Sequence, residues 1–231
     1  MSSAGPKPDA AAPQGSSPRP LVLGVVGGIA SGKSRVARLL AGADGVHVDA
    51  DALAHEALET PAVRAWVSER IGAQALSSER VDRGAVAKAV FAQPELRREL
   101  EALVHPLVRS AIAEALERAR REARTRVVLD VPLLLENDAQ HQLVAQCDAL
   151  VFVDTDARVR RARASATRGW SEEELARREA AQLPLETKRS RADVVIPNDG
   201  DWAQTASAAQ DALRRIEQRL AHPTERPRAE R

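Results

Sequence analysis

The chain has 231 residues, of which 44% are hydrophobic and only 2% aromatic, so it can bury one sizeable core of aliphatic side chains. Its 34 basic and 33 acidic residues give a formal net charge of +1, which excludes a strong overall positive field but leaves local arginine clusters open, and we expect no nucleic-acid partner. Cys147 is the only cysteine and no apolar run approaches the roughly 18 to 20 residues that span a bilayer, so we expect a cytoplasmic protein with no disulfide and no membrane partner.

The N-terminal residues 1–20 are rich in Pro, Ser and Ala and lack the apolar centre of a signal peptide, so we expect a disordered tail. An apolar run then predicts a strand over 21–26, and an amphipathic pattern predicts a helix over 32–40. The sequence GGIASGKS at 27–34, between them, fits the phosphate-binding pattern G-x-x-x-x-G-K-[ST].

A phosphate cradle of this kind combines three chemical features. Glycines let backbone N–H groups point inward at a helix N-terminus, whose partial positive charge favours anions. The ammonium of Lys33 reaches the β- and γ-phosphates of a nucleoside triphosphate, and the hydroxyl of Ser34 is a ligand for Mg²⁺. The nucleotide-binding residues expected here are Gly28, Ala30, Ser31, Gly32, Lys33, Ser34 and Arg35.

Two carboxylates follow the second predicted strand, which covers 46–48. Asp49 and Asp51 lie at the end of the strand where a doubly wound sheet places its ligands. Next to a triphosphate, a carboxylate can orient an acceptor hydroxyl and take its proton during phosphoryl transfer. Asp51 taken alone is also typical of a helix cap, so a catalytic and a structural interpretation both stay open.

The segment 52–124 carries no strong strand pattern and is predicted to be helical. Pro and Gly signals place its breaks at Thr60-Pro61, Gly72, Gln93-Pro94 and His105-Pro106. Strands resume with the apolar run 126–137, in which Asp130 closes the sequence VVLD in the manner of a Walker B element. Its carboxylate is expected to hold Mg²⁺ directly or through a water molecule; the alternative is an aspartate that caps a turn.

A further strand is predicted over 148–156, and an arginine-rich helical pattern follows over about 157–183. On a segment that closes over a nucleotide, one or two arginines can neutralise charge on the moving phosphoryl group, whereas most belong to a solvated helix face. We therefore predict a lid, interrupted at Arg168-Gly169. The apolar run ADVVIP and a closing helix over 202–220 complete the pattern, and 221–231 are expected to form a second tail.

Further stretches follow the phosphate loop in one order: DADALA (49–54), LVHPLV (103–108), DVPLLLEN (130–137), REAAQ (178–182) and KRSRADVVIPNDG (188–200). Together they closely resemble the dephospho-coenzyme A kinases over about residues 21–217. The resemblance implies an α/β P-loop kinase with a five-stranded parallel sheet, a helical substrate-binding insertion and a helical lid. In that interpretation 21–51 and 125–220 form the nucleotide-binding core, and 52–124 form the acceptor-binding insertion.

The resemblance also implies an activity: the γ-phosphoryl group of ATP, bound with Mg²⁺, is transferred to the ribose 3′-hydroxyl of dephospho-coenzyme A. This is the last step of coenzyme A synthesis. By matching position, Asp51 is the general base and Asp49 supports it, while His105 and Asn137 would lie along the acceptor site. The oligomeric state is left open.

By the same matching, Asn198 and Gly200 would sit beside the adenine of ATP. Family members usually carry Gly at the position of Ala30, and the methyl group is accommodated there if φ is negative. The lid sequence TRGWS displaces the usual arginine by one residue. Either Arg163 or Arg168 is therefore expected to serve as the catalytic lid arginine.

Other function classes share the phosphate cradle. A nucleoside or nucleoside-monophosphate kinase has the same cradle and lid but gives no reason for the PLLLEN and HP stretches. A non-catalytic ATP-gated binding protein would bind ATP without releasing ADP in response to an acceptor. A GTPase would need an NKxD-type guanine-binding sequence, which the chain lacks.

Overall fold

The computed structural model describes residues 19–77 and 80–222. Most of the two predicted tails lies outside these residues. Within them, Arg19 forms an ion pair with Asp148, with 2.6 Å between the closest nitrogen and oxygen atoms. The folded part of the chain therefore begins before residue 21, where the sequence analysis placed its start.

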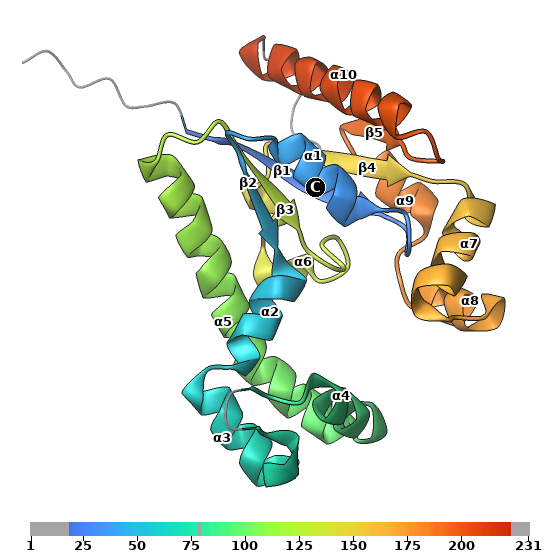
Figure 1. The fold of residues 1–231 in the computed structure, drawn as a ribbon. Coiled ribbons are helices and arrows are strands. Elements are labelled where there is room, and N and C mark those ends of the chain that lie inside the picture. Colours follow the sequence, from blue (N-terminus) through green and yellow to red (C-terminus); the bar gives the residue numbers. More distant parts are fainter. Residues whose placement is uncertain (1–18, 78–79, 223–231) are drawn as a thin grey trace, which may run out of the picture.

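Five parallel strands form one sheet in the order β2-β3-β1-β4-β5 (Figure 1). They are β1 (Leu21–Gly27), β2 (Val46–Asp49), β3 (Arg126–Asp130), β4 (Ala149–Asp154) and β5 (Val194–Pro197). This confirms the predicted five-stranded parallel sheet. Because β1 is central, the loop that follows it emerges in the middle of the carboxyl edge of the sheet, where ligands of such folds bind.

Aliphatic side chains of β1 alternate between two cores. Val22 and Val26 pack into the core on one face, which α5 and the segment after β3 cover. Leu23 and Val25 pack into the core on the other face, beneath α1 (Lys33–Ala41) and α10 (Trp202–Ala221). Both faces are covered, as expected for a parallel sheet.

The segment between β2 and β3 is helical, as predicted. It contains α2 (Ala50–Leu58), α3 (Pro61–Arg70), η1 (Ala73–Ala75), α4 (Arg83–Ala92) and α5 (Pro94–Arg121). Figure 1 shows α3 and α4 at the end of α5 that is farther from the sheet. Although α5 has 28 residues, neither it nor any other helix of the described residues is long and apolar enough to cross a membrane.

The predicted break at His105-Pro106 is wrong, because α5 continues through Pro106. On one side of the proline, Val104 packs into a small core that α2, α3 and α4 share with α5. On the other side, Ile112 and Leu116 pack against the sheet. Packing at both ends of the helix outweighs the lost hydrogen bond at Pro106. A tertiary cause of this kind is not visible in the local sequence.

The predicted lid consists of α7 (Ala157–Arg168) and α8 (Glu172–Ala180). Gly169 separates them with φ of 65°, and Ser171 caps α8, so the predicted interruption at Arg168-Gly169 is confirmed. In Figure 1 both helices lie beyond the carboxyl ends of β1 and β4. The short helices α6 (Asp138–His141) and η2 (Val144–Gln146) follow β3, and α9 (Leu185–Ser190) leads into β5.

We expect Pro106→Ala to raise the free energy of unfolding by about 2 kcal/mol. Alanine restores an N–H donor and removes the clash of the proline ring with the carbonyl group of Ala102. Pro106 is exposed, so the substitution removes little packing. Urea unfolding followed by circular dichroism measures the change. An unchanged or lower stability would mean that the proline geometry itself is needed by the packing of α5.

Candidate active site

The phosphate loop has the backbone that its glycines predict. Gly32 caps α1 with φ of 85°, and a Cβ atom there would lie 2.4 Å from Nδ2 of Asn198, so only glycine fits. The ammonium of Lys33 donates to the carbonyl oxygens of Gly28 at 2.8 Å and Gly27 at 3.4 Å. Its side chain thus folds back over the loop, where a phosphate group would be held.

The condition of a negative φ at Ala30 is not met, because φ there is 58°. A left-handed conformation costs an L-residue about 1 to 2 kcal/mol. Ala30 packs with Trp170 of the lid against a small cluster that contains Ile29 and Leu175. This contact offsets part of the strain and joins the phosphate loop to the lid.

A cleft of about 640 Å³ opens at the phosphate loop. It is lined by these predicted site residues: Ala30, Gly32, Lys33, Ser34, Arg35, Asp51, Asp130, Arg163 and Arg168. The other predicted site residues do not line it: Gly28, Ser31, Asp49, His105, Asn137, Asn198 and Gly200. The cleft therefore brings together the phosphate loop, both metal-binding candidates, the candidate base and both lid arginines.

The two aspartates after β2 have different roles. Asp49 caps α2, since its Oδ1 accepts a hydrogen bond from the backbone N–H of Ala52 at 3.1 Å. Asp51 lies in the first turn of α2 and lines the cleft. Desolvation, and next the negative charges of Asp49 and Asp130, raise the pKa of Asp51 above its ordinary value of 3.8. A carboxylate with a raised pKa is a better proton acceptor.

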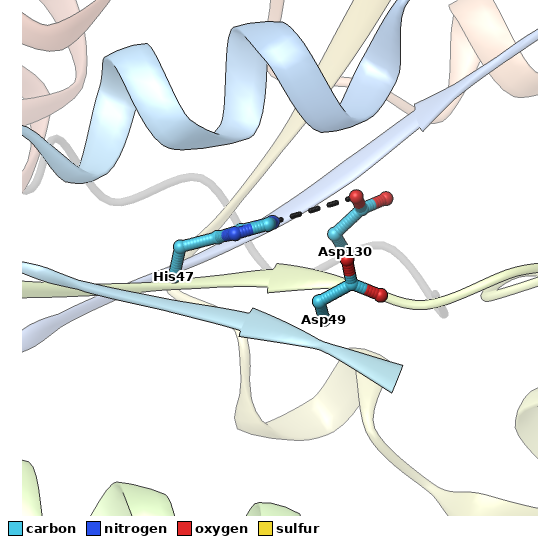
Figure 2. Close-up of side chains that lie close together, drawn as sticks. All are labelled: His47, Asp49 and Asp130. Carbon is cyan, nitrogen blue, oxygen red and sulfur yellow. Dashed lines mark ion pairs between the residues drawn. The ribbon is translucent and has the colours of Figure 1, made fainter. Parts of the chain in front are cut away.

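Asp130 ends β3 beside Ser34 and His47. Figure 2 shows His47 pointing toward Asp130, with 3.4 Å between Nε2 and Oδ2, and Asp49 close by. Burial alone would raise the pKa of Asp130, but the neighbouring side chains of His47 and Ser34, together with the charge of Lys33, keep it below 3.8. The carboxylate is therefore ionised next to a hydroxyl group. These oxygen donors fit Mg²⁺, which prefers oxygen ligands.

Potential ligand atoms of His47, Asp49 and Asp130 all lie within 4.8 Å of one another. Asp49 already accepts the capping hydrogen bond of α2, and imidazole nitrogen is a poor ligand for Mg²⁺. Ser34 and Asp130 are accordingly the residues best suited to hold Mg²⁺ beside the phosphates.

The two candidate lid arginines differ in their contacts. Arg163 donates to the backbone carbonyl oxygens of Asn198 at 2.9 Å and Ser31 at 3.4 Å, so it braces the phosphate loop. Arg168 lies over the ring of Trp170, 4.7 Å from its centroid. Within residues 19–77 and 80–222, no carboxylate forms an ion pair with Arg168, so its guanidinium is available to a ligand in the cleft.

Four further predicted residues lie away from the open cleft. Asn198 is buried, and its Nδ2 donates to the carbonyl oxygen of Ser31 at 2.6 Å, which is a contact with the phosphate loop. Gly200 is exposed. His105 is exposed on α5, and Asn137 precedes α6 without a capping side-chain hydrogen bond.

Sequence reasoning missed several side chains that line the cleft, among them Arg97, Glu136, Trp170, Arg178, Gln182 and Lys188. Lys188 and Glu136 form an ion pair with 2.7 Å between Nζ and Oε1. Both belong to stretches that carried the family resemblance, which was the available signal.

Burial, and the nearby charges of Lys188 and Arg168, lower the pKa of Lys33 to about 8, although Asp130 acts in the opposite direction.

Comparisons with known proteins point to one family. The family model described as dephospho-CoA kinase matches residues 21–204. A dephospho-CoA kinase of Symbiobacterium thermophilum is 40% identical over 195 residues, which cover 84% of this chain and 80% of that protein. The crystal structure of TT1252 from Thermus thermophilus is 35% identical, with a TM-score of 0.68 over 90% of this chain and 100% of that one.

A second solved structure has the same fold. The dephospho-CoA kinase from Campylobacter jejuni is 23% identical, with a TM-score of 0.63 over 85% of this chain and 97% of that one. The family model covers most of this chain, and the relative from Symbiobacterium thermophilum matches most of its own length. The chain therefore belongs to the dephospho-CoA kinase family, whose members are kinases that catalyse the last step of coenzyme A biosynthesis.

Proposed function

We propose that this chain transfers the γ-phosphoryl group of ATP to the ribose 3′-hydroxyl of dephospho-coenzyme A, with Mg²⁺ as cofactor, in the cytoplasm. The observation that carries the proposal is the position of Asp51. Its carboxylate lies in one cleft with Lys33 and Ser34, it does not cap α2, and its pKa is raised. A phosphate cradle facing a free carboxylate supports transfer to an alcohol.

Ser34 and Asp130 are the residues that would hold Mg²⁺ in this function. The ion supplies positive charge beside the β- and γ-phosphates when it is bound. His47, through its 3.4 Å contact, fixes the orientation of the Asp130 carboxylate.

Phosphoryl transfer then divides among residues of the cleft. Backbone N–H groups of the loop and the ammonium of Lys33 bind the phosphates. Asp51 accepts the proton of the 3′-hydroxyl group while the oxygen of that group forms a bond to the γ-phosphorus. At the same time the bond between the γ-phosphorus and the β-phosphate oxygen breaks, and ADP leaves. Arg168 neutralises charge on the transferred group, and the lid excludes water. No covalent intermediate with the protein is needed.

Residues outside the cleft act indirectly in this proposal. Asn198 and Arg163 hold the phosphate loop through the carbonyl oxygen of Ser31. Predictions of acceptor contacts for His105 and Asn137, and of adenine contacts for Asn198 and Gly200, stay predictions. We expect no nucleic-acid partner, as the balanced charge indicates.

We expect Asp51→Asn to lower kcat by on the order of 10² or more, because asparagine cannot accept the proton of the hydroxyl. The affinity for ATP should stay nearly unchanged, since the phosphate loop is intact. Acceptor-dependent ADP release measures kcat, and calorimetry measures ATP binding. An unchanged turnover would leave Asp51 without a catalytic role.

The same assay separates the alternative functions. Dephospho-coenzyme A should stimulate ADP release, and nucleosides and nucleoside monophosphates should not. Stimulation by a nucleoside monophosphate in place of dephospho-coenzyme A would favour a nucleoside-monophosphate kinase. ATP binding without any acceptor-dependent release would favour a non-catalytic binding protein.

The raised pKa of Asp51 predicts how activity depends on pH. The base must be deprotonated, so kcat/KM should fall as the pH drops through a pKa above 3.8. Asp49→Asn removes one of the negative charges that raise this pKa, and asparagine can still cap α2. The acidic limb of the profile should therefore move to lower pH in the variant. A limb that stays in place, or moves to higher pH, would contradict this account.

Arg163→Ala and Arg168→Ala should affect different kinetic constants. Arg168→Ala should lower kcat by on the order of tenfold or more with little effect on ATP affinity, because its charge acts on the transferred group. Arg163→Ala should weaken ATP binding, because the loop loses a brace at Ser31 and Asn198. Steady-state kinetics and ATP calorimetry on both variants distinguish the roles. The reverse pattern would exchange the two assignments.

A further inference from the structure

Two of the chain's four lysines lie together in the cleft. The chain has thirty arginines, and its lysines are Lys7, Lys33, Lys88 and Lys188. Lys33 and Lys188 line the cleft, and Lys188 comes from α9, which follows the lid. The function proposed above uses Lys33 and gives no role to Lys188.

The ammonium group of Lys188 is buried, with only 4% of the side chain exposed. Its Nζ donates to Oε1 of Glu136 at 2.7 Å and to Oε1 of Gln182 at 2.8 Å. The carboxylate of Glu136 stabilises the charged form, which burial alone would disfavour. An ammonium group has three N–H donors, so these two contacts leave one for a ligand.

Lys33 and Lys188 both line the cleft, where their like charges repel each other. A phosphate group between two ammonium groups converts this repulsion into two attractions. The pair therefore indicates an anion site that is larger than Lys33 alone would provide.

The segment after β3 determines which phosphate Lys188 would meet. This segment begins beyond Asp130, the candidate ligand of Mg²⁺, and it carries Glu136. Glu136 also accepts a hydrogen bond from the backbone N–H of Leu183 at 3.1 Å, which ties the segment to the stretch between α8 and α9. The phosphate loop holds the α- and β-phosphates of ATP, so the phosphate that extends toward this segment is the γ-phosphate.

We propose that Lys188 is a second phosphate-binding cation, which contacts the γ-phosphate of ATP opposite Lys33 while Glu136 holds it in place. This proposal rests on the ATP-dependent kinase function proposed above. During transfer the ammonium group stays hydrogen-bonded to the phosphoryl group. The bond from phosphorus to the oxygen of ADP breaks, and a bond from phosphorus to the acceptor oxygen forms. The proton of the acceptor hydroxyl goes to Asp51.

The test compares binding of ADP with binding of AMP-PNP, a non-hydrolysable ATP analogue, to the full chain with Mg²⁺. Lys188→Met should weaken AMP-PNP binding about tenfold or more, because a charge-assisted hydrogen bond to the γ-phosphate is lost. ADP lacks that phosphate and should bind within about twofold of the wild type. Lys88→Met, at an exposed position of α4, is the matched control and should leave both affinities unchanged.

A second variant separates phosphate binding from a purely structural ion pair. Lys188→Met combined with Glu136→Gln removes both charges, so no unpaired carboxylate stays buried if the single variant is unstable. The double variant should show the same selective loss of AMP-PNP affinity. Recovery of that affinity, or equal weakening of ADP and AMP-PNP, would overturn the proposal. Acceptor-dependent ADP release by the wild type tests the kinase function separately, because AMP-PNP selectivity requires no acceptor.

Discussion

The carbonyl oxygen of Ser31 is the point on which the shape of the phosphate loop depends. It accepts hydrogen bonds from Nδ2 of Asn198 at 2.6 Å, from Oγ1 of Thr155 at 3.0 Å and from Nη1 of Arg163 at 3.4 Å. These donors follow β5, follow β4 and lie in α7, respectively. One peptide group of the loop is thus fixed from three separate elements. The sheet and the first lid helix together set the geometry in which phosphates are held, before any nucleotide arrives.

A second contact joins the lid to the phosphate loop. Ala30 adopts a left-handed backbone conformation, and it packs with Trp170 against the same small cluster. The ring of Trp170 lies under the guanidinium groups of Arg168 and Arg178, at 4.7 and 4.1 Å from its centroid. The cluster that holds Ala30 and Trp170 therefore also orients Arg168, the arginine that is available to a ligand.

Features coded by contiguous residues could be predicted from the sequence. The phosphate loop, the five strands and the lid interruption at Gly169 all depend on local patterns. The course of α5 through Pro106 and the φ angle of Ala30 could not be predicted, because packing against distant elements decides both. The contact of Asn198 with the loop joins residues 167 positions apart. The place of Lys188 in the cleft could not be predicted for a similar reason, because its buried ion pair depends on Glu136, which lies in another segment of the chain.

The charges of the cleft explain why the site is suited to transfer rather than to binding alone. Burial lowers the pKa of Lys33 to about 8, and desolvation raises the pKa of Asp51, so the cleft disfavours the ionised forms of both side chains. The negative phosphates of ATP would favour the charged form of Lys33, and they would also make Asp51 more basic. In the proposed mechanism, binding the donor therefore strengthens both Lys33, the cation that would hold it, and Asp51, the base that would activate the acceptor. A switch protein needs only the first of these effects, whereas a kinase needs both.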